Sequence, residues 1–145
     1  AEQPAEALVT LAARKYTCAN EISDTEATKK TVKKDGKDVY QFTKPASPEE
    51  FERLKQCARE GLELVNKAVE LAPNSDSAWS YKANLLGQQA RIAEMEGNTA
   101  EQERLKDEAD QAKERFIALN EEKKKREAEE EARKKAEAEA ANKKK

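Results

Sequence analysis

The chain contains no histidine, the side chain that most often serves as a general base or metal ligand at neutral pH. Without it, no serine or cysteine triad of the usual kind can be assembled. The sequence also has no P-loop and no Gly-x-Gly-x-x-Gly fingerprint. Carboxylates are abundant, but nearly all of them fall in amphipathic helical patterns, where a solvated face explains them. We therefore expect a non-enzymatic protein.

Large apolar side chains are scarce as well. Of 145 residues, 5% are aromatic and 40% are charged, which leaves material for one domain with a thin core. Much of the 37% hydrophobic content is alanine, and this favours closely packed helices. No apolar run approaches the roughly 20 residues that a membrane span needs. The net charge of −2 offers no overall polycation for nucleic acid. We expect an all-α domain that neither spans a membrane nor binds nucleic acid.

The clearest local pattern lies between Ser47 and Asn98. Ser47 and Pro48 are an N-cap and a proline at the first helical position, and Glu50 completes a capping box. Pro73 ends this helix. Small and apolar residues recur along it at steps of three and four, which indicates one buried face: Phe51, Leu54, Ala58, Gly61, Leu62, Val65, Ala68, Val69 and Ala72.

Three further helices are predicted around this one. The first covers residues 4–22, and the second runs from a cap at Asn74–Asp76 to about Glu96. The last begins with Thr99 as its cap and Gln102 as capping-box partner, after a stop signal at Gly97. The apolar stripe of the first consists of Leu8, Leu11, Ala12 and either Cys18 or Ala19. That of the second consists of Trp79, Ala83, Leu86, Ala90 and Ala93, and that of the last of Leu105, Ala109, Ala112, Phe116 and Leu119.

An insertion at residues 28–46 separates the first two helices. Its Asp35–Gly36 pair predicts a two-stranded hairpin with a type I′ turn. Such a hairpin is marginal in water, so its apolar side chains need a surface to lie on, either the protein's own helices or a neighbour. These side chains are Val32, Val39, Tyr40 and Phe42. We interpret the lysines at positions 29, 30, 33 and 34 as a charged edge that discourages unwanted strand pairing.

Five residues in the helical part resemble a known repeat pattern. Gly61, Ala68 and Pro73, followed by Trp79 and Ala83, are similar in type and spacing to the junction of two tetratricopeptide repeats. Lys82 and Leu86 depart from the family's leucine and tyrosine positions. The resemblance covers roughly residues 5–120. It implies two helical hairpins that stack as a solenoid and bind other proteins, with Trp79 in the core and Tyr81 on the partner-binding face.

Two cysteines fall where an antiparallel pair of helices would bring them together. Cys18 lies late in the first helix and Cys57 early in the second. Export to an oxidising compartment predicts a disulfide, whereas two buried free thiols are the alternative. The start Ala1–Pro4 resembles the end left by signal-peptide removal. A chain trimmed at a domain edge is the alternative there, and we favour export.

The composition changes after Asn120, and we divide the chain into a helical domain at 1–120 and a tail at 121–145. In the tail, 18 of 25 residues are charged. Glu-to-Lys or Glu-to-Arg pairs at i,i+4, such as Glu129–Arg133 and Glu130–Lys134, favour a solvated helix. The tail is similar in composition to the alanine-lysine-glutamate stalks of periplasm-spanning proteins. A disordered tail is the alternative.

Metal sites have little support, and no cofactor is expected. The oxygen-rich segments Asn20–Glu26 and Asn74–Asp76 suggest at most structural calcium between chains, and neither has the EF-hand spacing. Helix capping is the better explanation of Asn74–Asp76.

Two functions compete for this exported, non-enzymatic module. The first is a structural subunit that assembles head-to-tail with its own copies, for example into an extracellular filament. A short solenoid without capping helices leaves apolar faces at both ends, and the insertion and tail would then lie against neighbours. The second is an adaptor that binds a peptide or helix of another protein on its concave face. The candidate contact residues are Val39, Tyr40, Phe42 and Tyr81.

Overall fold

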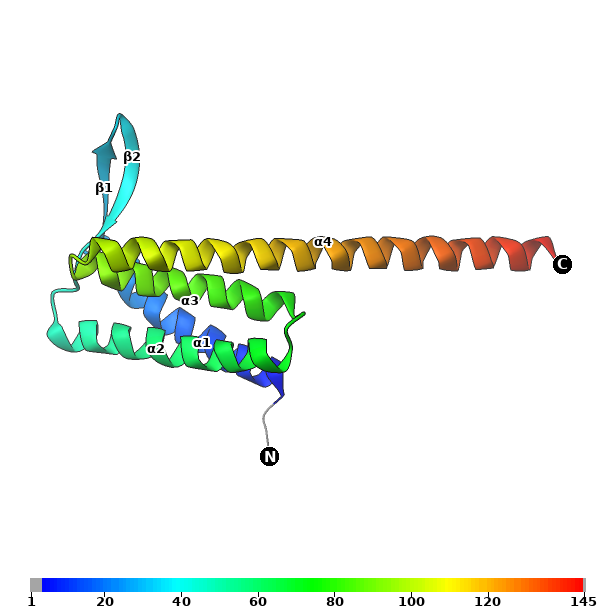
Figure 1. Ribbon diagram of the computed structural model, residues 1–145, viewed down its shortest axis with the longest axis horizontal. Coiled ribbons are helices and arrows are strands. Elements are labelled where there is room, and N and C mark those ends of the chain that lie inside the picture. Colours follow the sequence, from blue (N-terminus) through cyan, green and yellow to red (C-terminus); the bar gives the residue numbers. More distant parts are fainter. Residues whose placement is uncertain (1–3, 145) are drawn as a thin grey trace.

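The computed structural model describes residues 4–144. Ala1–Gln3, on which the export prediction partly depends, and Lys145 lie outside the described residues. Within them, four helices and one antiparallel pair of strands follow in chain order (Figure 1): α1 (Ala5–Ser23), β1 (Lys29–Lys34), β2 (Lys37–Phe42), α2 (Pro48–Leu71), α3 (Asp76–Met95) and α4 (Thr99–Lys143). The prediction of a mostly helical chain with a small hairpin is confirmed.

Serine side chains cap α2 and α3 as the sequence predicts. The Ser47 hydroxyl oxygen accepts a hydrogen bond from the Glu50 N–H, and Pro48 is the first residue of α2. The Ser75 hydroxyl oxygen accepts from the Ala78 N–H at the start of α3. Each bond satisfies one of the N–H groups that a helix leaves without an internal partner.

The predicted cap of α4 is wrong by one residue. The N-cap is Asn98, whose side chain accepts from the Glu101 N–H, and Thr99 is the first helical residue. Asparagine is a better N-cap than threonine, which explains the shift. Gln102 does not complete a capping box but donates from Nε2 to the Glu94 carboxylate at 3.1 Å.

The helices pack as two antiparallel pairs, α1 with α2 and α3 with α4, and α3 also lies against α1 and α2 (Figure 1). Because α3 has neighbours on two sides, it buries more residues than the single predicted stripe. Leu86, Ala90 and Ala93 belong to the predicted stripe and share a core cluster with α4. The other side buries Ala78, Leu85, Gln88, Ile92 and Met95.

The centre of the core lies between α2, α1 and α3. Leu54, Val65 and Leu85 are completely buried there. Leu62, Val69 and Ala72 of the predicted stripe are only half-buried, whereas Cys57, which that stripe omitted, is buried.

Gly61 marks a close approach of α2 to α1 and α3. A Cβ added there would lie 2.6 Å from Leu85 Cδ2 and 3.0 Å from Lys15 Cβ, so only glycine allows this packing. Gly87, in the middle of α3, is the opposite case, because a Cβ there would meet nothing within 4 Å.

These two glycines give a matched pair of substitutions. We expect Gly61→Ala to lower the free energy of unfolding by about 1–2 kcal/mol, because overpacking exceeds the gain in helix propensity. Gly87→Ala should raise it by about 0.5–1 kcal/mol, since only the propensity changes. Urea unfolding measures both. Equal stabilisation by the two alanines would contradict the contact between Gly61 and Leu85.

The helix α4 continues without a break far beyond the bundle (Figure 1). All residues from 121 to 143, called here the rod segment, are exposed, and at about 1.5 Å per residue they extend about 35 Å. Lys134 Nζ lies 3.5 Å from Glu130 as predicted, but Arg133 pairs with Glu137 at 3.1 Å rather than with Glu129. The expectation of a helical tail is confirmed. Within the described residues, the rod segment has ion pairs of its own, which favour the helix by a few tenths of a kcal/mol each.

Few large apolar side chains are exposed among the described residues. They are Leu71 on α2, Ile117 on α4, and Val39 and Tyr40 on the hairpin. Within residues 4–144, no helix is both long enough and apolar enough to cross a membrane.

Candidate functional site

The base of the hairpin is fixed to the end of α1. Thr28 is buried, and its hydroxyl donates to the backbone carbonyl oxygen of Ser23 at 2.7 Å. On the other strand, the Thr43 N–H donates to the Thr28 carbonyl at 2.8 Å. At the far end, Asp35 and Gly36 have φ values of 53° and 78°, as the predicted type I′ turn requires.

Phe42 anchors β2 to the helices. Its half-buried ring packs against the core cluster that contains Cys57 and Met95, and the Arg91 guanidinium lies 4.4 Å from the ring centroid. Its N–H donates to Glu94 Oε1 at 2.8 Å. Phe42 was predicted as a partner-contact residue, but it serves as the hairpin's own attachment.

Arg91 is held in place by a network of polar side chains, two of which, Ser23 and Gln88, are buried. The Ser23 hydroxyl donates to Gln88 Oε1 at 2.8 Å, and Gln88 Nε2 donates to Asn20 Oδ1 at 3.1 Å. Arg91 Nη1 donates to both Asn20 and Ser23. Every member has a partner, so the network can fix one arrangement of α1 and α3. Glu94 makes a separate connection, because it accepts hydrogen bonds from the Phe42 N–H of the hairpin and from Gln102 Nε2 of α4.

Two adjoining hollows lie between β2 and the helices, and together we call them the hairpin cleft. The inner one, about 200 Å³, is lined by Tyr40, Phe42, Gly87, Ala90, Arg91, Glu94, Gln102 and Lys106. The outer one, about 570 Å³, extends along the hairpin and α4. The missing side chain at Gly87 leaves the floor of the inner hollow open.

The wall that α4 contributes to the outer hollow is acidic. Glu103, Asp107 and Asp110, called here the acidic row, line it together with Lys34 and Lys106. Among the described residues, none of the three carboxylates of the row forms an ion pair. The row is therefore able to attract a cationic partner.

The outer part of the hairpin is exposed. Tyr40 and Val39 have exposed fractions of 62% and 38%, the feature that makes them available to a partner. Lys29 Nζ lies 4.1 Å from the Tyr40 ring centroid. Figure 1 shows the hairpin standing away from the helices. The hairpin's apolar residues were predicted to need a surface to lie on, and Phe42 has one on the helices. Val39 and Tyr40 remain exposed in the described chain.

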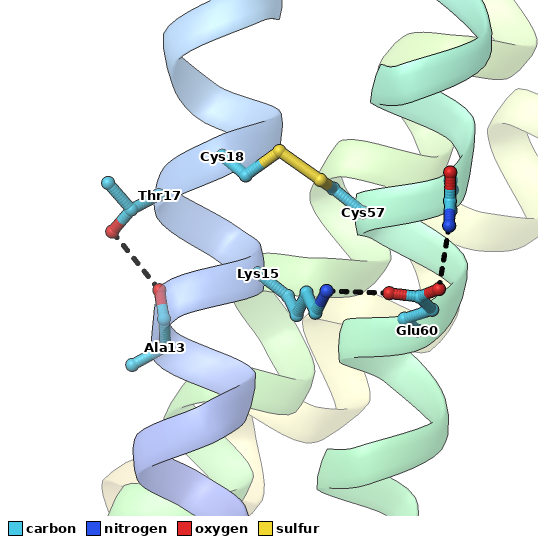
Figure 2. Close-up of a disulfide and its surroundings, with 7 residues drawn as sticks. Ala13, Lys15, Thr17, Cys18, Cys57 and Glu60 are labelled. Atoms are coloured by element: carbon cyan, nitrogen blue, oxygen red, sulfur yellow. Dashed lines mark hydrogen bonds and ion pairs between the residues drawn. A yellow bond between two sulfur atoms is a disulfide. The ribbon is translucent and has the colours of Figure 1, made fainter.

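Cys18 and Cys57 form a disulfide between α1 and α2, with their Cα atoms 6.2 Å apart (Figure 2). One turn away, Lys15 Nζ lies 2.6 Å from Glu60 Oε2. Hydrogen bonds from Lys15 and then Gln56 hold the pKa of the Glu60 carboxyl below its usual value. The lowered pKa means that any stabilisation by this pair is present above the ordinary pKa of glutamate and is lost as the pH falls.

The other residues predicted from the repeat resemblance lie in packing positions. Ala68 is buried with Leu8 and Ala78, while Ala83 and Trp79 are half-buried beside α4. The Trp79 indole N–H donates to the Pro73 carbonyl at 2.8 Å, so it stabilises the loop after α2.

Tyr81 is half-buried, and its ring packs edge-on against Tyr16, with 6.3 Å between centroids. Its place on a partner-binding face stays a prediction.

The oxygen-rich segments have local partners. Asn74 Oδ1 accepts from Arg115, and Asp76 Oδ1 accepts from the Ser77 N–H. Within residues 4–144, no group of His, Cys, Asp and Glu forms a cluster that could hold a metal ion.

Four residues of α3 were not predicted from the sequence: Gln88, Arg91 and Glu94, which support the hairpin, and Gly87, which lines the inner hollow. The helical pattern of the sequence predicts solvent-exposed positions for these residues. One available signal was Gly87, a glycine in a helix interior, which lowers helix stability relative to alanine and calls for a local reason.

Comparisons with protein-family models, with curated proteins and with solved structures found no match to this chain. The resemblance to the tetratricopeptide repeat therefore stays a prediction.

Proposed function

We propose that this chain is a non-enzymatic structural protein that associates with further copies of itself through its hairpin. The observation that carries the proposal is the contrast between the two strands. β1 has lysine at four of its six positions, whereas β2 holds the exposed Val39 and Tyr40 beside a cleft. β2 carries only Lys37 and Asp38 as charged residues, and an exposed strand edge with few charges is a site of strand addition.

The rod segment supports a structural role. It is a continuous solvated helix, which acts as a semi-rigid spacer rather than a flexible tether. We propose that the hairpin and the bundle hold copies together, while the rod segment projects away from their contact.

The helical bundle is proposed to be tetratricopeptide-like. Two antiparallel helix pairs lie side by side, and Gly61, in the small-residue position of the repeat junction, allows Leu85 and Lys15 to approach. Bundles of this kind are known as protein-binding scaffolds, which agrees with an interaction role. The disulfide supports residence in an oxidising compartment, and export remains our proposal.

Sedimentation of the intact, oxidised chain tests self-association. Between about 10 µM and about 1 mM, we expect the average mass to rise above 16.3 kDa, because a small interface gives weak, concentration-dependent association. A variant that ends at Asn120 should associate equally well, since the rod segment is exposed along its length and lies away from the hairpin. A mass that stays at that of the monomer over the whole range would refute self-association.

A second candidate function is an adaptor for an extended peptide of another protein, and Gly87 favours it. The open floor beside Gly87 and Ala90 has room for a side chain of an added strand. This function takes the place of self-association if the intact chain stays monomeric.

A further inference from the structure

The hydrogen-bond pattern of the hairpin determines which β2 groups are free. The register pairs Thr31 with Tyr40 and Val32 with Val39, and the Thr43 N–H is bonded to Thr28 across the strands. In an antiparallel pair, bonded and non-bonded positions alternate. Val39 and Gln41 therefore bond to β1, whereas Asp38, Tyr40 and Phe42 point their N–H and C=O groups away from it.

Glu94 closes one end of this free edge. It accepts the outward N–H of Phe42, which agrees with the alternation and shows that the edge faces the helices. The outward backbone groups that remain belong to Asp38 and Tyr40, and both residues are exposed. The free edge is thus two outward residues long and is centred on Val39.

We infer that β2 pairs with β2 of a second copy about a two-fold axis at Val39, forming a four-stranded antiparallel sheet. This register places Tyr40 of each copy opposite Asp38 of the other, so their outward N–H and C=O groups satisfy one another. It leaves the bond from Phe42 to Glu94 intact. The two Val39 residues then face each other at a non-hydrogen-bonded position, with Cα atoms about 4.5 Å apart, and each covers an exposed apolar side chain of the other.

Charge favours a second copy as the occupant. In the two-fold register, the lysine-bearing turn of each hairpin, with Lys34 and Lys37, lies beside the base of the other. There α4 carries the acidic row, whose carboxylates have no ion-pair partner in the described chain. Opposite charges at such a rim favour encounter and register.

The lysines of β1 disfavour the other edge. The other edge of the hairpin is formed by β1, which reads Lys-Lys-Thr-Val-Lys-Lys. Its residues also alternate between those bonded to β2 and those whose backbone N–H and C=O groups face outward. Pairing two such strands would bring like charges together, which is destabilising. Self-association through β2 alone gives a closed dimer, because a two-fold contact uses the same surface on both copies.

The inference rests on the proposed self-association and names its contact. Val39→Cys tests it, because thiols at facing non-hydrogen-bonded positions lie within the 4.4–6.8 Å Cα range of disulfides. The control is Gln41→Cys, on the same strand and the same face. In this register its two introduced thiols are about 13 Å apart.

Both variants are incubated at high concentration under mild oxidation. We expect at least tenfold more covalent dimer from Val39→Cys than from Gln41→Cys, with peptide masses showing the bond between Cys18 and Cys57 intact. Equal cross-linking of the two variants would overturn the two-fold register.

A second pair of variants tests the same contact without new thiols. Val39→Lys places like charges opposite each other across the axis, so the dissociation constant should rise at least tenfold. Thr31→Lys adds the same charge on β1 and should leave the dissociation constant unchanged. Circular dichroism checks that both variants fold. If the wild-type chain associates but Val39→Lys does not weaken it, the β2 contact is wrong while self-association stands. If the wild-type chain never associates, the proposed function fails as well.

Discussion

Reduction of the disulfide between Cys18 and Cys57 should lower the free energy of unfolding by about 4 kcal/mol. The bond joins residues 39 apart in the sequence, and the chain-entropy model gives this magnitude for a closed loop of about 40 residues. The chain has few large apolar side chains to compensate, so a loss of this size is a large part of the stability of a small domain.

Denaturant unfolding of the oxidised and the reduced chain measures this effect. The control is the double variant Cys18→Ala, Cys57→Ala, whose unfolding should not respond to the reductant. Identical midpoints for the oxidised and reduced wild-type chain would contradict a stabilising disulfide.

Alanine in place of Leu85 should lower the free energy of unfolding by about 2–5 kcal/mol, the range for large-to-small changes in a core. Leu85 is completely buried and lies against Gly61. The surroundings have little freedom to close the cavity, because the disulfide and the contact at Gly61 hold α1 and α2 in place.

Leu71→Ala is the matched control, since the same side chain is 48% exposed there. It should change the free energy of unfolding by no more than about 0.5 kcal/mol. Equal losses for Leu85→Ala and Leu71→Ala in urea unfolding would contradict the packing of α3 against α2.

Local chemistry made the element boundaries predictable. Ser47 with Pro48, and Ser75 after Pro73, identify helix starts because each supplies a specific backbone requirement. The Asp35–Gly36 turn was equally clear, since few residue pairs accept two positive φ values in succession. The cap of α4 was ambiguous by one residue because Asn98 and Thr99 are both capping types.

Tertiary relations were less visible. The double burial of α3 could not be predicted from a single stripe, because it depends on which helices lie on either side. Gln88 and Arg91 read as solvated positions, and their roles appear only when α1 brings Asn20 and Ser23 within hydrogen-bonding distance. Phe42 was predicted to need a surface, but the sequence did not indicate that Arg91 and Glu94 of α3 would supply it.

The assembly predicted from the sequence is revised for a physical reason. Head-to-tail stacking requires apolar end faces, and Leu71 and Ile117 are the large apolar side chains of the described helices that are exposed. The exposed apolar pair that remains together is Val39 and Tyr40, and this moves the proposed contact from the bundle ends to the hairpin.

The most direct measurement of this contact is an amide NMR dilution series of the intact, oxidised chain. The account predicts that the Asp38 and Tyr40 amide signals move as concentration rises, because their N–H groups gain partners. The Phe42 amide, bonded to Glu94 within one copy, should keep its bond, and the amides of the rod segment should not move. Concentration-dependent shifts confined to α1, α2 or the rod segment, or no shifts at all, would contradict association through β2.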